Sequence, residues 1–99
     1  MTPEAKVKKK VRETLKALGA YYAMPVTGGY GVSGAPDFLI CWRGQFFGVE
    51  CKANGNKPTP LQERALQAIK DAGGASIVID ENNADQLGSW MRAHEDINN

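Results

Sequence analysis

The chain has 99 residues, and we expect a single domain over residues 1–99 because this length leaves no room for a second core. The hydrophobic content of 42% and the charged content of 23% are ordinary for a soluble globular protein. No apolar run approaches the roughly 20 residues of a membrane span, and no apolar segment follows the basic N-terminus as in a signal peptide. We therefore expect an intracellular, cytoplasmic protein with no membrane partner.

The charges are unevenly distributed, although the net charge is only +1. Half of the twelve basic residues lie within residues 6–16, whereas acidic residues dominate the last twenty positions. A basic segment suits a polyanion such as nucleic acid. A solvated helix face explains the same residues equally well, so this feature alone leaves both interpretations open.

The N-terminal segment predicts an amphipathic helix. Thr2, Pro3 and Glu4 are an N-cap, a proline at the first helical position and an acid in the first turn. Apolar side chains then follow at helical spacing until a glycine ends the pattern: Val7, Val11, Leu15, Leu18 and Gly19. Residues 20–26 (AYYAMPV) predict a short strand, in which Pro25 indicates either a sheet edge or a strand end. A glycine-rich loop follows.

Residues 37–42 (DFLICW) and 45–52 (QFFGVECK) predict two strands joined by a tight turn at Arg43-Gly44. With this turn, Asp37 lies directly opposite Glu50, and directly opposed Cβ atoms are only about 4.5–5.5 Å apart. Two acids at that distance repel each other, so a shared proton or a bound cation must offset the repulsion. Paired carboxylates are hard oxygen ligands suited to Mg²⁺ or Mn²⁺. A β-bulge would shift this register.

Glu50 and Lys52 lie two residues apart, so they point to the same face of the strand. Two carboxylates and an ammonium group match the need of phosphodiester cleavage for a metal-bound phosphate beside a lysine. The alternative is an ordinary ion pair at a solvated strand end. The predicted position of Asp37 favours the first interpretation. The two cysteines should face opposite sides of the sheet and remain unpaired.

The second half of the chain predicts a helix, a strand and a short helix. Thr59 and Gln62 indicate a capping box, and ASIVI (75–79) is typical of a buried strand. Asn83 and Gln86 suggest another capping box. The apolar face of the first of these helices is expected to be Leu61, Ala65, Ala68, Ile69 and Ala72. The lone His94 is interpreted as a surface residue.

These elements predict the order α-β-β-β-α-β-α, which is a mixed α/β fold. The strand–helix–strand unit from 45 to 79 should be a parallel crossover, which gives a small mixed sheet flanked by helices.

The residues around the two acids resemble the PD-(D/E)XK nuclease signature: GAPD (34–37), then ECK (50–52), with Glu50 thirteen residues after Asp37. More narrowly, the chain resembles a stand-alone virus-type replication-repair nuclease (VRR-NUC) domain from Glu4 to about Ile79. The supporting features include PTPLQERAL and AGGASIVI. The resemblance implies a restriction-endonuclease-like core.

The resemblance also implies roles for individual residues. Asp37 and Glu50 would ligate Mg²⁺ or Mn²⁺, with the backbone carbonyl of Cys51 as a further ligand. Lys52 would position or activate the attacking water, or stabilise the pentavalent phosphate. Gln62 fits a glutamine that family members use near the site, although its capping box is a complete structural reason for it.

Family members further use a glutamate on the first helix, for which this chain has two candidates. Glu4 falls within the apolar stripe of the helix, whereas Glu13 falls on the opposite, lysine-rich side. A side chain that reaches the sheet must come from the stripe, so we favour Glu4. The candidate DNA contacts are Lys6, Lys9, Lys10, Tyr30, Ser33 and Lys57.

The function that we expect is a metal-dependent endodeoxyribonuclease selective for Holliday junctions or other branched DNA. Small stand-alone members resemble junction resolvases, so we expect a homodimer that presents two sites to two strands, in a prokaryotic or phage-infected cell. The alternatives are a flap or single-strand nuclease in replication or repair, and a non-catalytic DNA-binding module. No nucleotide cofactor is expected, because no helix opens within the glycine pattern GYGVSG (29–34) as the dinucleotide fingerprint requires.

Overall fold

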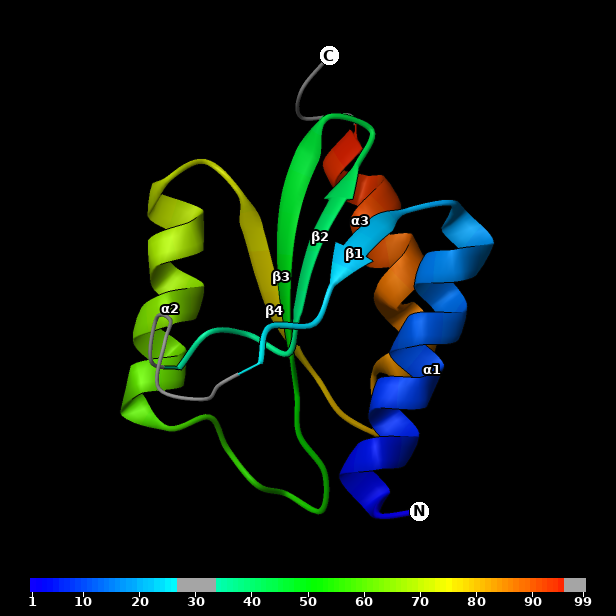
Figure 1. Ribbon diagram of the computed structural model, residues 1–99, viewed down its shortest axis with the longest axis vertical. Helices are drawn as coiled ribbons and strands as arrows, with labels where there is room; N and C mark the ends of the chain where they lie inside the picture. Colours follow the sequence, from blue (N-terminus) through cyan, green and yellow to red (C-terminus); the bar gives the residue numbers. More distant parts are fainter. Residues whose placement is uncertain (27–33, 96–99) are drawn as a thin grey trace.

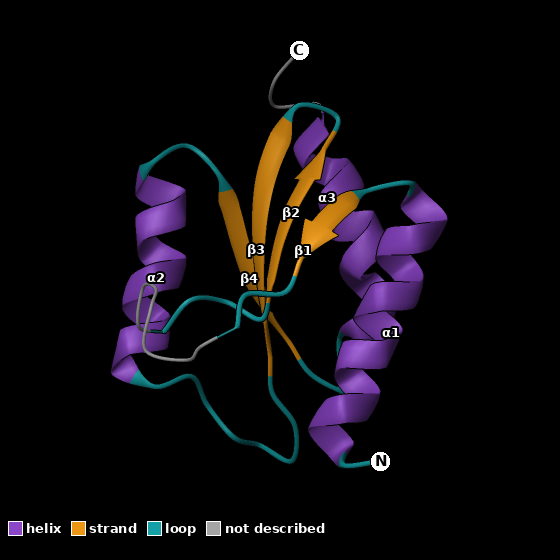
Figure 2. Ribbon diagram, in the orientation of Figure 1, coloured by secondary structure: helices purple, strands orange, loops and turns teal. Residues whose placement is uncertain are grey.

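The computed structural model describes residues 1–26 and 34–95, and within these ranges it has three α-helices, a 3-10 helix and one four-stranded sheet. The elements are α1 (Pro3–Leu18), β1 (Tyr21–Ala23), β2 (Phe38–Trp42), β3 (Gln45–Cys51), α2 (Pro60–Asp71), β4 (Ala75–Ile79), η1 (Ala84–Gln86) and α3 (Leu87–Glu95). Helix α2 lies on one side of the sheet, and α1 and α3 lie together on the other (Figure 1, Figure 2). The predicted α/β class and element order are confirmed.

The sheet has the strand order β1-β2-β3-β4. Strand β2 pairs antiparallel with both β1 and β3, whereas β3 and β4 are parallel and are joined through α2. The edge position of β1 is confirmed. The strand is shorter than predicted and ends at Ala23, two residues before Pro25, which has no N–H to donate to a ladder.

The main hydrophobic core lies between the sheet and the α1–α3 layer. Helix α1 begins at the N-cap Thr2, whose hydroxyl accepts a hydrogen bond from the Ala5 N–H at 3.1 Å, and ends at Gly19. Because its apolar residues repeat at helical spacing, they reach the sheet as one stripe. The fully buried side chains of this core include Leu15, Phe38, Ile40, Phe47, Val49, Cys51, Leu87 and Met91.

The opposite face of the sheet is less completely covered. Gly48 lets α2 approach closely, because a Cβ at this position would lie 2.4 Å from Cδ1 of Ile69. Leu66 is buried in α2, although the predicted apolar face did not include it. Leu61, which was part of that predicted face, is 48% exposed. The rest of that predicted face lines an open groove and is not sealed into a core.

Two predictions about the C-terminal part are wrong. Asn83 caps no helix with its side chain; its amide accepts from the Asp80 N–H and donates to the Val78 carbonyl, so it braces the end of β4. His94 is half-buried and not a surface residue, since its ring packs 4.7 Å from that of Trp90 and 6.0 Å from that of Phe47. Hydrogen bonds at the end of β4 decide the first outcome, and the packing of the ring decides the second.

Candidate active site

The β2–β3 hairpin brings Asp37 and Glu50 to the same end of the sheet. The predicted register is confirmed from Trp42–Gln45 to Phe38–Val49; Glu50 is the next residue of β3, and Asp37 directly precedes β2. The two turn residues, Arg43 and Gly44, both have positive φ (50° and 77°), as a two-residue hairpin turn requires. The described part of the hairpin contains no bulge that would separate the acids.

Asp37 is held at the edge of the strand by a backbone donor. Its Oδ2 accepts a hydrogen bond from the Cys51 N–H at 2.8 Å, where the β2 ladder has ended. The approach to Asp37 is equally constrained, because Gly34 has φ 78° and a Cβ there would lie 2.6 Å from the backbone of Leu61. The chain therefore contacts the start of α2 closely just before it reaches Asp37.

Glu50 is a buried acid, with 3% of its surface exposed. Its Oε2 lies 3.6 Å from Nζ of Lys52, while its Oε1 is buried without a hydrogen-bond partner among the described residues. Burial, followed by the negative charge of Asp37, raises the pKa of Glu50 to about 7, although Lys52 acts in the opposite direction. A buried, incompletely paired carboxyl is costly, so this arrangement needs a functional reason.

Helix α1 contributes a residue that the predicted site lacks. Nζ of Lys8 lies 3.6 Å from Oε2 of Glu4 and 3.6 Å from Oδ1 of Asp37. Glu4 therefore reaches the carboxylates through Lys8, whereas the alternative, Glu13, pairs with Lys9 at 4.0 Å. The signal for Lys8 was present in the sequence, because a residue four positions after Glu4 shares its side of a helix.

Gln62 serves the start of α2. Its Oε1 accepts a hydrogen bond from the Thr59 N–H at 2.9 Å, and its own N–H donates to the Thr59 hydroxyl at 3.2 Å. This confirms the predicted capping box. Within residues 1–26 and 34–95, no hydrogen bond joins the Gln62 side chain to the carboxylates, so a role at the site stays a prediction.

The predicted DNA contacts on α1 are exposed, but acids neutralise part of their charge. Lys9 pairs with Glu13, and Lys10 pairs with Asp85. Lys6 lies beside Lys10 in a shallow cavity of about 240 Å³. Any phosphate contact from Lys9 or Lys10 would therefore compete with an existing ion pair.

Three further predicted DNA contacts lie elsewhere. Lys57 is exposed in the loop before α2. Tyr30 and Ser33 fall outside the described residues.

The donors at this centre fit a hard divalent cation. Asp37 and Glu50 offer carboxylate oxygens, and the buried Oε1 of Glu50 is a polar atom that a cation would satisfy. No group of three or more His, Cys, Asp or Glu side chains in the described ranges could hold a metal ion. Two carboxylates completed by water are nevertheless typical of Mg²⁺. The Cys51 thiol is no ligand candidate, because burial, with the nearby acids, raises its pKa to about 12.

No family model and no curated protein matches this chain. Among solved structures, one described as "VRR_NUC domain" is 32% identical and superposes with a TM-score of 0.73, covering 88% of this chain and 95% of that chain. Another, described as "VRR_NUC domain protein", is 16% identical with a TM-score of 0.66, covers 94% of this chain and 88% of that chain, and supports the fold. The chain therefore belongs to the VRR-NUC domain family, with a nuclease-type function.

Proposed function

We propose that this protein is a divalent-metal-dependent endodeoxyribonuclease that cleaves branched DNA, such as Holliday junctions, as a homodimer. The proposal depends on the buried Glu50, which lies near both Asp37 and Lys52. Its Oε1 has no hydrogen-bond partner among the described residues. A protein that only binds DNA gains nothing from holding two carboxylates together in the low dielectric of a sheet. A metal-dependent hydrolase needs this arrangement.

Asp37 and Glu50 would hold the Mg²⁺ or Mn²⁺, and the Cys51 carbonyl is the further ligand that we predict. When bound, the ion would stabilise charge on a phosphoryl oxygen and lower the pKa of a bound water. Asp37 is oriented for this task by the Cys51 N–H, which fixes Oδ2. Glu50 is oriented by its rigid place in a central strand.

Lys52 is the residue that we propose for contact with the reacting phosphate or water. Its ammonium lies 3.6 Å from Oε2 of Glu50, and its backbone N–H donates to Ile79 at the end of β4. The main chain at Lys52 is thus anchored while the side chain remains partly accessible. A fixed positive charge beside developing phosphate charge stabilises the transition state.

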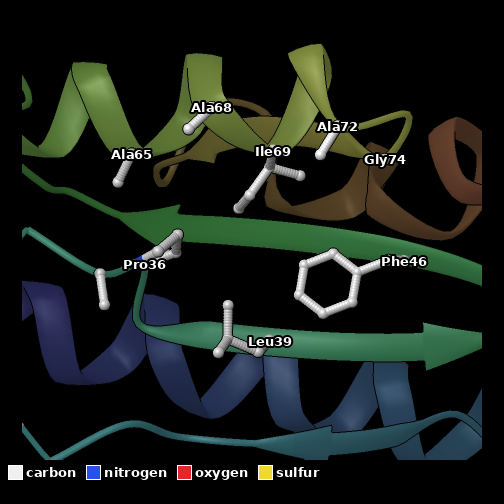
Figure 3. Close-up of a pocket in the computed structure, with 9 residues that line it drawn as sticks. Pro36, Leu39, Phe46, Ala65, Ala68, Ile69, Ala72 and Gly74 are labelled. Carbon is white, nitrogen blue, oxygen red and sulfur yellow. The ribbon is translucent and has the colours of Figure 1, made fainter. Parts of the chain in front are cut away.

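The homodimer is supported by the open groove between α2 and the sheet. Ile69 points from α2 toward the strands that carry Leu39 and Phe46, across a groove of about 420 Å³ (Figure 3). Phe46 is 44% exposed there. We propose that a second copy of the chain covers this apolar surface, since a symmetric pair would present two sites to the two strands of a junction.

The test is a cleavage assay on four-way junctions, flaps, single strands and linear duplex, with Mg²⁺, with Mn²⁺ and with chelator. Lys52→Ala should lower kcat at least about 100-fold, as loss of a transition-state contact typically does, while the exposed Lys70→Ala serves as the matched control. Cleavage that persists in chelator or in Lys52→Ala would contradict the mechanism. Equal cleavage of linear duplex would contradict selectivity for branched DNA.

A further inference from the structure

Lys8 connects helix α1 to the carboxylates of the site. Its Nζ lies 3.6 Å from both Oε2 of Glu4 and Oδ1 of Asp37. The side chain is 30% exposed, about half the value of 58% for its neighbour Lys9, which pairs with Glu13 on the surface. Lys8 is thus partly enclosed between two acids that come from different elements.

The contacts of Asp37 divide the site into two unequal sides. On the first side, Oδ1 of Asp37 and the carboxylate of Glu4 already share the positive charge of Lys8. On the second side, Oε1 of Glu50 is buried with no hydrogen-bond partner in the described part of the chain. The protein therefore supplies a lysine ammonium on both sides, Lys8 at Asp37 and Glu4 and Lys52 at Oε2 of Glu50, but Oε1 of Glu50 is still open to a cation.

We propose that Lys8 is a resident cation of this centre: its ammonium occupies the Glu4 side of Asp37, so that the site binds one divalent ion, through Asp37 and Glu50, and not two. The inference rests on the proposed metal-dependent function. Two-metal sites place their ions about 3.5–4 Å apart around shared carboxylates. A second ion on Asp37 would have to displace an ammonium that two carboxylates hold.

The position of Lys8 supports this assignment. Its ammonium lies 3.6 Å from a carboxylate oxygen of Glu4 and 3.6 Å from one of Asp37, so two opposite charges hold it on this side of the site. In this role it is a positioning residue, because it neutralises and orients Asp37.

The test is a Mn²⁺ titration of the full chain without DNA, by calorimetry and by electron paramagnetic resonance of free Mn²⁺. The wild type should bind one ion per chain. Lys8→Met, which keeps the apolar part of the side chain, should bind two Mn²⁺ ions. It should bind the first at least roughly fivefold more tightly than the wild type binds its single ion, because the positive charge that repels Mn²⁺ is gone. Lys8→Arg and the matched control Lys16→Met, an exposed lysine of the same helix, should bind one ion with wild-type affinity, and Lys8→Gln should repeat Lys8→Met if methionine perturbs the fold.

Two Mn²⁺ ions in the wild type would overturn this inference alone. One ion in Lys8→Met and Lys8→Gln, with unchanged affinity, would overturn it as well. If the wild type and all Lys8 variants bind no ion, the proposed metal-dependent function falls together with the inference. Circular dichroism of each variant verifies that the compared chains are folded.

Discussion

Glu50 lies in a central strand between Val49 and Cys51, both of which belong to the hydrophobic core. The strand alternates, so its neighbours face the α1–α3 layer while Glu50 faces the other side near Asp37. Burial there disfavours the charged form of Glu50, and Asp37 disfavours it further. A cation would reverse both effects, which is why we regard this residue as the centre of the site.

The raised pKa of Glu50 predicts a pH-dependent stability of the metal-free protein. Its pKa is about 7 in the folded state against an ordinary value of 4.5, so between these values the unfolded chain binds fewer protons. The free energy of unfolding should therefore fall as pH rises from about 4.5 to about 7, by roughly 1–3 kcal/mol. Glu50→Gln should remove this loss.

Urea unfolding between pH 4.5 and 8, in the presence of chelator, measures the effect. Glu63→Gln, an exposed substitution in the first turn of α2, is the matched control and should keep the wild-type pH dependence. A pH dependence in Glu50→Gln as steep as that of the wild type would contradict the assignment to Glu50.

At the scale of elements, two glycines of the hairpin meet different physical demands. Gly44 lies in the turn with φ 77°, and a Cβ added there would meet only open space, so its backbone conformation alone requires glycine. Gly48 lies in β3, where a Cβ would come within 2.4 Å of Cδ1 of Ile69. One glycine therefore sets the register, and the other permits α2 to pack.

Two double-mutant cycles that share Ile69→Val separate these two roles. Gly44→Ala should lower the free energy of unfolding by about 1–2 kcal/mol, because alanine disfavours the left-handed φ of this position. The loss should be the same in an Ile69→Val background. Gly48→Ala should lower the free energy of unfolding by about 1–3 kcal/mol through overpacking against Ile69. Adding Ile69→Val should recover at least about 0.5 kcal/mol of this loss. Unfolding free energies in urea, measured for the wild type, the three single variants and the two double variants, give both cycles. Equal coupling of Ile69→Val to both alanines would refute the distinction.

At the scale of the whole molecule, the two faces of the sheet are unequally covered. One face packs against α1 and α3 to form the hydrophobic core. The other face is covered by α2 only in part, so an apolar groove remains open beside Phe46. A small domain buries a limited core, so covering this surface in a dimer would add stability. The asymmetry is a property of the packed layers and of no single residue.

This asymmetry predicts the effect of one substitution on assembly. Phe46→Asp should shift the protein from dimer to monomer in sedimentation velocity at micromolar concentration, because it places a charge in the apolar groove. Tyr21→Asp, an equally drastic change at an exposed position of the edge strand β1, should leave the dimer intact. A monomeric wild type, or dissociation by Tyr21→Asp alone, would contradict a dimer formed through the groove.

The sequence by itself determined the features that depend on neighbours along the chain. The helix starts at Thr2 and Thr59, the element order and the hairpin register all follow from capping, periodicity and turn chemistry. The proximity of Asp37 to Glu50 belongs to this class, because a two-residue turn leaves only one register without a bulge. The capping box predicted at Asn83 is wrong because its amide accepts from the Asp80 N–H and donates to the Val78 carbonyl at the end of β4.

Only the tertiary structure decided which distant segments meet. The contact of Lys8 with Asp37, the packing of His94 on Phe47 and the open groove beside Ile69 join residues from different elements. Local patterns indicate which side of a helix is apolar, but they contain neither the angle at which the helix crosses the sheet nor the reach of its long side chains. Those depend on how whole layers pack, and here that packing places a helix lysine beside the carboxylates.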